Sequence, residues 1–322
     1  MGRDTFSSKA ILLLQLGTPD APTPKALRRY LRQFLSDRRV IRVPRMIWLP
    51  LLYGIILPFR APKSAKLYQK IWRPEGSPLL LESEKIRKAL QAKLPDTPVV
   101  LGMRYGEPSI AKALGFAKDR LDQLLVLPLF PQYSSTTTAA AFDGLAKTLR
   151  QWHNLPEVVF IRDYWREDGY LQALADSIQQ FWNKHGRAQK LIFSFHGIPQ
   201  GYVDAGDPYP NACMATALSV AQKLHLHKDQ WLVAFQSRFG KSPWTRPYTD
   251  EILVELGLQG IQQADIVCPG FSVDCLETLE EINIRYREHF AEHGGTLRYI
   301  PALGAAPALI ETFAHRLGAK FV

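Results

Sequence analysis

Cysteine is scarce in this 322-residue chain, which contains only Cys213, Cys268 and Cys275. The three are far apart and form no C-x-x-C pair, so the sequence predicts neither a disulfide framework nor a thiol redox motif. Three thiols also fall short of the four that an all-cysteine iron–sulfur cluster requires. We therefore expect a protein of a reducing compartment without a [2Fe–2S] cluster.

Long apolar runs are missing as well. The most apolar segment lies within residues 46–66 and spans roughly 14 residues interrupted by Pro50 and Pro58, whereas a membrane-spanning helix needs about 20. The apolar run 10–16 continues into GTPD without a small-residue cleavage site, which argues against a signal peptide. We therefore expect a cytoplasmic protein.

Several common catalytic motifs are absent from the sequence. It contains no G-x-S-x-G, no P-loop and no G-x-G-x-x-G. Nothing therefore indicates a serine hydrolase, a nucleotide kinase or a dinucleotide-dependent oxidoreductase.

Negative charge is nearly absent from one segment. Between Lys25 and Arg73 there are thirteen Lys and Arg residues and a single acid, Asp37, a net charge of +12. The whole chain carries +10, so the remainder sums to −2. Such a localised excess predicts an anionic partner. Nucleic acid fits poorly, because the basic residues flank aliphatic side chains rather than stacking aromatics.

The same segment has two interpretations, which the sequence leaves open. It can form an ordinary buried helical hairpin. It can also form a mobile lip, about residues 38–78, that covers a cleft and meets a flat hydrophobic ligand or the inner face of a membrane. In the second case its apolar face would include Trp48, Leu52, Tyr53 and Ile56, and Arg42, Arg45, Arg60, Lys63 and Lys66 would face carboxylates or anionic headgroups.

Short unbroken apolar runs are typical of buried parallel strands. Helix-like stretches separate them, which predicts an α/β protein with open parallel sheets. Eight such runs occur, at residues 10–16, 99–103, 123–130, 157–161, 190–195, 231–235, 265–271 and 297–303.

These strands fall into two sets of four with matching ends. The first strand of each set ends in Gly-x-Pro, at Gly17 and Gly197, and the second leads to Arg-aromatic-Gly, at Arg104 and Arg238. Matches in the same order predict an internal duplication. The corresponding gaps are 87 and 41 residues, so the first half carries about 46 extra residues, which coincide with the basic segment.

We therefore expect two similar Rossmann-like domains, each a four-stranded parallel sheet flanked by helices. The first would span residues 9–165 and include the lip, and the second residues 166–303. A C-terminal helix, 304–322, would pack back on the first. Duplicated α/β domains commonly bind ligands outside the carboxyl ends of their strands.

His196 stands at one of those ends, and an acidic helix begins near another. Asp274, Glu277, Glu280 and Glu281 open this helix, with Glu277 and Glu281 on one helical face. Asp274 and Glu277 also have the spacing of a capping box, which would give Glu277 a purely structural role. One imidazole and one carboxylate suit transient capture of a divalent ion or general-base catalysis.

A second histidine motif competes with this site. HFAEH, His289 to His293, matches the H-x-x-E-H pattern of inverzincin proteases. It lies in a charged helix that ends at Gly294 and Gly295, so we expect it to face solvent rather than to form a protease centre.

Longer motifs give the sequence a specific resemblance to ferrochelatases, especially bacterial ones, over about residues 9–305. The motifs that carry it are LLQLGTPDAPTPKALRRYLRQFLSDRRVI, GMRYGEPS, LPLFPQYSSTTT, SFHGIP, FQSRFGKSPWTRPYTD and CPGFSVDCLETLEEI. The resemblance implies a chelatase-like fold and insertion of Fe²⁺ into protoporphyrin IX, with release of two protons and no organic cofactor. Many relatives carry a [2Fe–2S] cluster on four cysteines, one more than this chain has.

The resemblance also implies roles for individual residues. His196 matches the metal-site histidine and Glu277 the glutamate paired with it, while Asp274 and Glu281 match members of an acidic relay for metal or protons. The positions expected to line the porphyrin cleft are Leu16, Arg104, Tyr105, Tyr133 and Trp244. Three other activities stay open: cobalt or nickel insertion into a related tetrapyrrole, a porphyrin carrier that docks on membranes, and the metalloprotease implied by HFAEH.

Overall fold

The computed structural model describes residues 8–240 and 242–320. Lys241 in the RFGKSPW motif and the last two residues of the expected C-terminal helix lie outside the described residues. All eight expected strands are present. Their bounds are β1 Lys9–Thr18, β2 Val99–Gly106, β3 Gln123–Pro128, β4 Glu157–Phe160, β5 Lys190–His196, β6 Trp231–Gln236, β7 Gln263–Val267 and β8 Thr296–Ile300.

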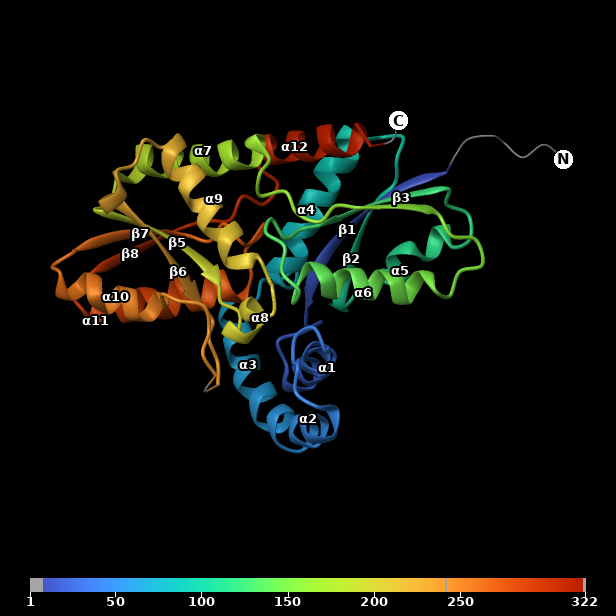
Figure 1. Ribbon diagram of the computed structural model, residues 1–322, viewed down its shortest axis with the longest axis horizontal. Coiled ribbons are helices and arrows are strands. Elements are labelled where there is room, and N and C mark those ends of the chain that lie inside the picture. Colours follow the sequence, from blue (N-terminus) through green and yellow to red (C-terminus); the bar gives the residue numbers. More distant parts are fainter. Residues whose placement is uncertain (1–7, 241, 321–322) are drawn as a thin grey trace.

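The strands form two four-stranded parallel sheets of identical topology, which lie side by side (Figure 1). Their orders are β2-β1-β3-β4 and β6-β5-β7-β8, so each strand of the first sheet has a counterpart four strands later. In the registers, Gly17 faces Tyr105 and His196 faces Gln236. The predicted two-sheet α/β fold is confirmed.

Four strands end before the apolar runs that predicted them. β4 ends one residue early, at Phe160, β3 ends at Pro128, β7 ends two residues before Pro269, and β8 ends immediately before Pro301. Proline has no backbone N–H to donate to a neighbouring strand, which limits the ladder near Pro269 and Pro301 although the apolar character continues. Beyond Pro128, the N–H of Leu129 still donates to the Leu14 carbonyl at 2.7 Å.

Helices cover the faces of both sheets (Figure 1). Around the first sheet these are α4 Pro78–Lys93, α5 Ile110–Leu114 and α6 Thr138–Leu149. Around the second they are α7 Asp168–His185, α8 Gln200–Asp204, α9 Tyr209–Lys223, α10 Thr249–Leu258, the π-helix Glu277–Tyr286 and α11 Arg287–Glu292. Two 3₁₀ turns, Gly115–Ala117 and Lys228–Gln230, complete these connections.

The extra residues of the first half form a helical projection below the sheets (Figure 1). It comprises α1 Pro24–Leu35, α2 Arg45–Leu51, the π-helical turn Leu52–Ile56 and α3 Leu57–Ile71. Trp48 and Leu52 are buried in its own apolar cluster, and the Trp48 indole donates to the Leu35 carbonyl at 2.7 Å. Tyr53 is exposed and Ile56 is half-buried. The expected lip spanned about residues 38–78, but α1 packs with α3 in the same projection, so from here on the lip means residues 24–71.

One apolar cluster runs through both sheets. It includes Leu13 on β1, Phe193 on β5 and Leu309 on the C-terminal helix α12, Pro307–Gly318. α12 packs against α4 and α7, so it contacts helices of both halves. None of the helices within the described residues is long and apolar enough to cross a membrane.

Candidate active site

His196 is the last residue of β5 and is half-buried. Its Nδ1 lies 2.6 Å from the carbonyl oxygen of Gly197. A carbonyl oxygen can only accept, so Nδ1 carries the proton and the neutral ring keeps its lone pair on Nε2. The imidazole is thereby fixed in the tautomer that can bind a metal or accept a proton through Nε2.

Gln236 connects the end of β6 to the acidic helix. It is the Cα partner of His196, is fully buried, and accepts a hydrogen bond from the Ser194 hydroxyl at 2.9 Å. Its Nε2 donates to the backbone carbonyl of Glu277 at 2.9 Å and to the Glu281 carboxylate at 3.4 Å. A single amide therefore links the strand pair that carries His196 to the start of the π-helix.

The acidic helix is a π-helix from Glu277 to Tyr286 rather than the α-helix expected. In a π-helix each hydrogen bond spans five residues, so side chains at i and i+5 become neighbours. Two pairs here have that spacing: Glu280 with Arg285 at 3.2 Å, and Glu281 with the Tyr286 hydroxyl at 3.1 Å. Arg285 also lies 3.9 Å from Glu281, at i+4.

Glu281 is a buried carboxylate that is well supplied with donors. The backbone N–H of Ser237 donates to it at 2.9 Å, and the Ser237 hydroxyl and the Tyr286 hydroxyl donate as well. Burial, and next the charge of Glu281, raise the pKa of Tyr286. These bonds supply the buried carboxylate oxygens with hydrogen-bond donors.

Asp274 is held at the foot of the same helix. It accepts from the Tyr299 hydroxyl at 2.5 Å, from the Thr278 hydroxyl at 3.0 Å and from the N–H of Ala302 at 3.4 Å. The Thr278 hydroxyl also accepts from the N–H of Cys275 at 3.0 Å, so it connects the first turn of the helix to the residues before it, although the helix has no side-chain N-cap. Glu277 does not take the capping role that its spacing allowed.

Glu277 instead faces the lip. Burial lowers the pKa of Arg60 on α3, and the nearby charge of Glu277 opposes that shift. Burial is also the main cause of the raised pKa values of Tyr30 and Tyr68, with Glu277 contributing to both. The Glu277 carboxylate thus lies where the π-helix meets α1 and α3.

Gly17 forms the corresponding strand end in the first half, next to Leu16. Its φ is +118°, and a Cβ there would lie 1.7 Å from the Tyr105 carbonyl oxygen, so only glycine fits. The Tyr30 hydroxyl donates to the Gly17 carbonyl at 3.2 Å. Leu16 is half-buried between the apolar cluster of the first sheet and that of the lip.

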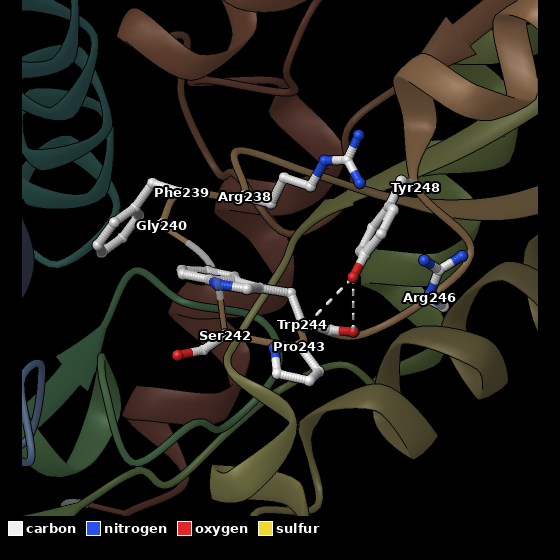
Figure 2. A pocket seen from close by; sticks show the side chains of 8 residues that line it. All are labelled: Arg238, Phe239, Gly240, Ser242, Pro243, Trp244, Arg246 and Tyr248. Atoms are coloured by element: carbon white, nitrogen blue, oxygen red, sulfur yellow. Dashed lines mark hydrogen bonds between the residues drawn. The ribbon is translucent and has the colours of Figure 1, made fainter.

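Trp244 stands beside His196, with their ring centroids 6.5 Å apart. Its indole also packs against Phe239 at 4.9 Å, and the Arg60 guanidinium lies over the Phe239 ring at 5.0 Å. Trp244 and Phe239 line one side of a cavity of about 580 Å³, shown in Figure 2. Its other side is formed by Arg238, Arg246 and Tyr248, and both guanidinium groups stack on the Tyr248 ring.

Arg104 and Tyr105 meet at Asp37, the one acid of the basic segment. The Arg104 guanidinium forms an ion pair with Asp37, and the Tyr105 hydroxyl donates to the same carboxylate at 2.8 Å. Tyr133 has another partner, the Arg162 guanidinium, which lies 4.3 Å from its ring centroid. A smaller cavity of about 430 Å³ opens nearby in the lip and is lined by Arg38, Ile41, Arg42, Val43, Pro44 and Arg45.

The structure therefore links His196 with Trp244 directly and, through Gln236, with Glu277 and Glu281. Sequence reasoning missed Gln236 and Ser237, although a glutamine that ends an apolar strand beside His196 was a visible signal. The HFAEH residues lie further along the chain, on α11 and immediately after it, with Glu292 exposed and both histidines half-buried.

Comparison with known proteins places this arrangement in a family. Residues 8–320 match the sequence model of the family described as ferrochelatase. A ferrochelatase from Methylococcus capsulatus is 50% identical over 305 residues, which cover 94% of each chain. A ferrochelatase from Escherichia coli (strain E24377A) is 49% identical over 311 residues, 96% of this chain and 97% of its own.

Solved structures agree at the level of the fold. The sirohydrochlorin chelatase SirB from Bacillus subtilis subspecies spizizenii, in complex with cobalt, superposes with a TM-score of 0.56 at 9% identity. The aligned region covers 97% of this chain and 94% of SirB. The fold is thus shared with a chelatase. The match to the family model and the identity with curated relatives over nearly the whole length show that this chain belongs to the ferrochelatase family.

Proposed function

We propose that the edge formed by His196, Glu277 and Trp244 is the place where this ferrochelatase inserts iron into its porphyrin. The activity is insertion of Fe²⁺ into protoporphyrin to make haem, and iron is a substrate of the reaction, which needs no organic cofactor. One observation carries the assignment of the site. His196 has a free lone pair on Nε2, and its strand end is hydrogen-bonded through Gln236 to the helix that begins at Glu277.

Each turnover replaces two pyrrole N–H protons by one Fe²⁺ ion, so the site must hold a cation and accept protons. In our proposal Nε2 of His196 binds the incoming ion or takes the first proton, and the Glu277 carboxylate shares the positive charge. Glu281 and Asp274 would then form a relay away from the ring. The Gln236 amide, which contacts the Glu277 carbonyl and the Glu281 carboxylate, supports such a path.

The porphyrin would lie between the second sheet and the lip. Trp244 offers an aromatic face beside His196, and Leu16 an apolar side chain at the matching strand end of the first half. Arg104, Tyr105 and Tyr133 would border the cleft behind the lip, with Arg104 and Tyr105 held by Asp37. Of the lip residues, Tyr53 and Ile56 would approach the ring, while Trp48 and Leu52 would hold the lip together from inside.

The two propionates of the porphyrin are negatively charged, so their binding site should contain cations. The cavity lined by Arg38, Arg42 and Arg45 offers three guanidinium groups beside Ile41 and Val43. Guanidinium groups pair with carboxylates bidentately, and adjacent aliphatic side chains suit the ring edge. We propose this cavity for the propionate end of the substrate.

The tip of the lip would touch a membrane. Met46 is 91% exposed and Phe59 69% exposed, with Ile47 and Ile55 also exposed. Arg45, Lys63 and Lys66 lie in the same helices. Exposed apolar side chains beside basic ones are the pattern of a peripheral contact with anionic lipid. We propose a cytoplasmic protein that docks on the inner face of the membrane and that carries no [2Fe–2S] cluster.

Loss of protoporphyrin fluorescence under anaerobic conditions, with Fe²⁺ added, tests the activity. Sirohydrochlorin with Co²⁺ or Ni²⁺ is the comparison substrate. We expect metallation of protoporphyrin in preference to sirohydrochlorin. Stoichiometric binding of protoporphyrin without metallation would instead identify a carrier and overturn the proposal.

A further inference from the structure

HFAEH, the motif that the ferrochelatase site does not use, places three metal-ligand side chains together. Among the described residues, His289, Glu292 and His293 form a group in which one ligand atom from each lies within 4.8 Å of the others. Figure 1 shows α11, which carries His289 and Glu292 and ends immediately before His293, at the outer end of the second half and away from the lip helices. The group is therefore separate from the site at His196.

Local contacts hold the ligand atoms of this group close to one another. Nδ1 of His293 lies 2.9 Å from the backbone carbonyl of His289, so that nitrogen donates and Nε2 keeps the lone pair. The two imidazoles are neighbours on the helix, with centroids 4.9 Å apart. The Glu292 carboxylate lies 3.7 Å from Nδ1 of His289.

The backbone beneath the group is held in place. Phe290, between the two histidines, is fully buried, and its ring packs on Gly295. On the neighbouring helix α10, a Cβ at Gly257 would lie 2.7 Å from the His293 carbonyl oxygen, so glycine there lets the end of α11 pack closely. The Glu292 side chain is 73% exposed and the His289 side chain 31% exposed, so both can rotate toward a common ion.

We propose that His289, Glu292 and His293 form a second, exchangeable binding site for a divalent transition metal ion such as Zn²⁺, Co²⁺ or Fe²⁺. Two imidazoles and one carboxylate suit these ions, whereas Mg²⁺ and Ca²⁺ prefer oxygen ligands only. Tetrahedral ligands at about 2.1 Å from Zn²⁺ lie about 3.4 Å apart, so small rotations of the side chains close the group. Water fills the remaining positions at this exposed place, so the ion exchanges freely.

The test counts zinc ions bound to the full-length protein. Chelator-treated protein is equilibrated with Zn²⁺ by dialysis in the presence of excess Mg²⁺, and bound metal is measured by elemental analysis. We expect H289A/H293A to bind one Zn²⁺ fewer per chain than wild type, with affinity at this site at least about a hundredfold weaker. His196→Ala should keep this ion, because the two sites share no ligand.

A matched control removes two exposed histidines elsewhere. H153A/H315A loses as many imidazoles, and neither residue belongs to the ligand group found in the described part of the chain. Circular dichroism shows that each variant is folded, and porphyrin metallation shows it for the two double variants, which keep His196. Equal zinc uptake by wild type and H289A/H293A would overturn the proposal, as would the same loss in the control or complete displacement of the ion by Mg²⁺.

Discussion

His196 and Gln236 are partners across the β5–β6 ladder, and the buried amide of Gln236 extends from that pair to the backbone of Glu277. The strand end that holds the imidazole is thus hydrogen-bonded to the helix that holds the carboxylate. The two proposed metal-site residues come from different elements, and the hydrogen bonds of Gln236, together with those of Ser237 to Glu281, hold these elements together.

Replacing Gln236 by Met should therefore disturb catalysis more than binding. The change keeps the volume but removes the hydrogen bonds to Ser194, to the Glu277 carbonyl and to Glu281, at a cost of about 1–3 kcal/mol in the free energy of unfolding. We expect kcat to fall about tenfold, with the KM for porphyrin nearly unchanged.

Gln132→Met is the matched control for that variant. Gln132 is another buried glutamine, and it donates to the Thr216 hydroxyl at 3.1 Å. Its replacement should lower stability without lowering kcat. A Gln236→Met enzyme with wild-type kcat would show that the amide does not position Glu277.

Removing the imidazole of His196 should abolish most of the activity. General-base catalysis contributes about 10²- to 10⁴-fold, so His196→Ala should lower kcat by at least a hundredfold. Porphyrin affinity, measured by fluorescence titration, should change little because Trp244 and the lip remain. Turnover within twofold of wild type would refute the role of His196, and His153→Ala is the control for loss of an exposed histidine.

Glu280 should matter for stability rather than for chemistry. It is buried and joins Lys70 of α3, at 3.1 Å, to Arg285 of the π-helix. Both cations are about half exposed, so they stay hydrated when Glu280 is replaced by Gln. We therefore expect the free energy of unfolding, measured with urea, to fall by about 1–3 kcal/mol. Glu311→Gln, which breaks an exposed pair with Lys93, should change stability by less than about 0.5 kcal/mol.

The lip tip should bind anionic vesicles. M46S/F59S removes two of its exposed apolar side chains, each worth about 1–2 kcal/mol when buried in lipid, so affinity for vesicles that contain anionic lipid should fall at least about tenfold. Leu258→Ser is the control, because Leu258 is 83% exposed but lies on α10. Vesicle binding that is equal in all three proteins would rule out the lip as the contact.

The thiols should resist alkylation in the folded protein. Cys213, Cys268 and Cys275 are buried, and burial raises the pKa of each, so little thiolate exists near neutral pH. Iodoacetamide at pH 8 should leave all three unmodified for hours and modify three per chain after unfolding in urea. Rapid modification of Cys275 alone would show that the helix carrying Glu277 opens in solution.

The sequence predicted the strands well because parallel strands are buried on both faces, which leaves unbroken apolar runs such as the one ending at His196. The duplication could be predicted because both halves keep Gly-x-Pro after their first strand, at Gly17 and Gly197, although only Gly17 has a positive φ. The shortened strands near Pro269 and Pro301 show the limit of this reasoning: apolar character marks burial, but only backbone N–H groups make a ladder.

Contacts between distant segments were beyond a single sequence. Nothing in the spacing of Glu277 and Glu281 distinguishes a π-helix from an α-helix. The wider turn is accompanied by tertiary contacts, among them Ser237 with Glu281 and Lys70 with Glu280. Asp37 likewise looked like the lone acid of a basic run, and only the fold brings Arg104 and Tyr105 to it.

The apolar core that continues from β1 through β5 to α12 makes the two sheets one stiff frame. The two halves therefore cannot separate without exposing this core. The lip helices pack around a different apolar cluster, which also includes Tyr105 of β2. In the proposed site the porphyrin would therefore rest between one continuous frame and a projection with its own packing.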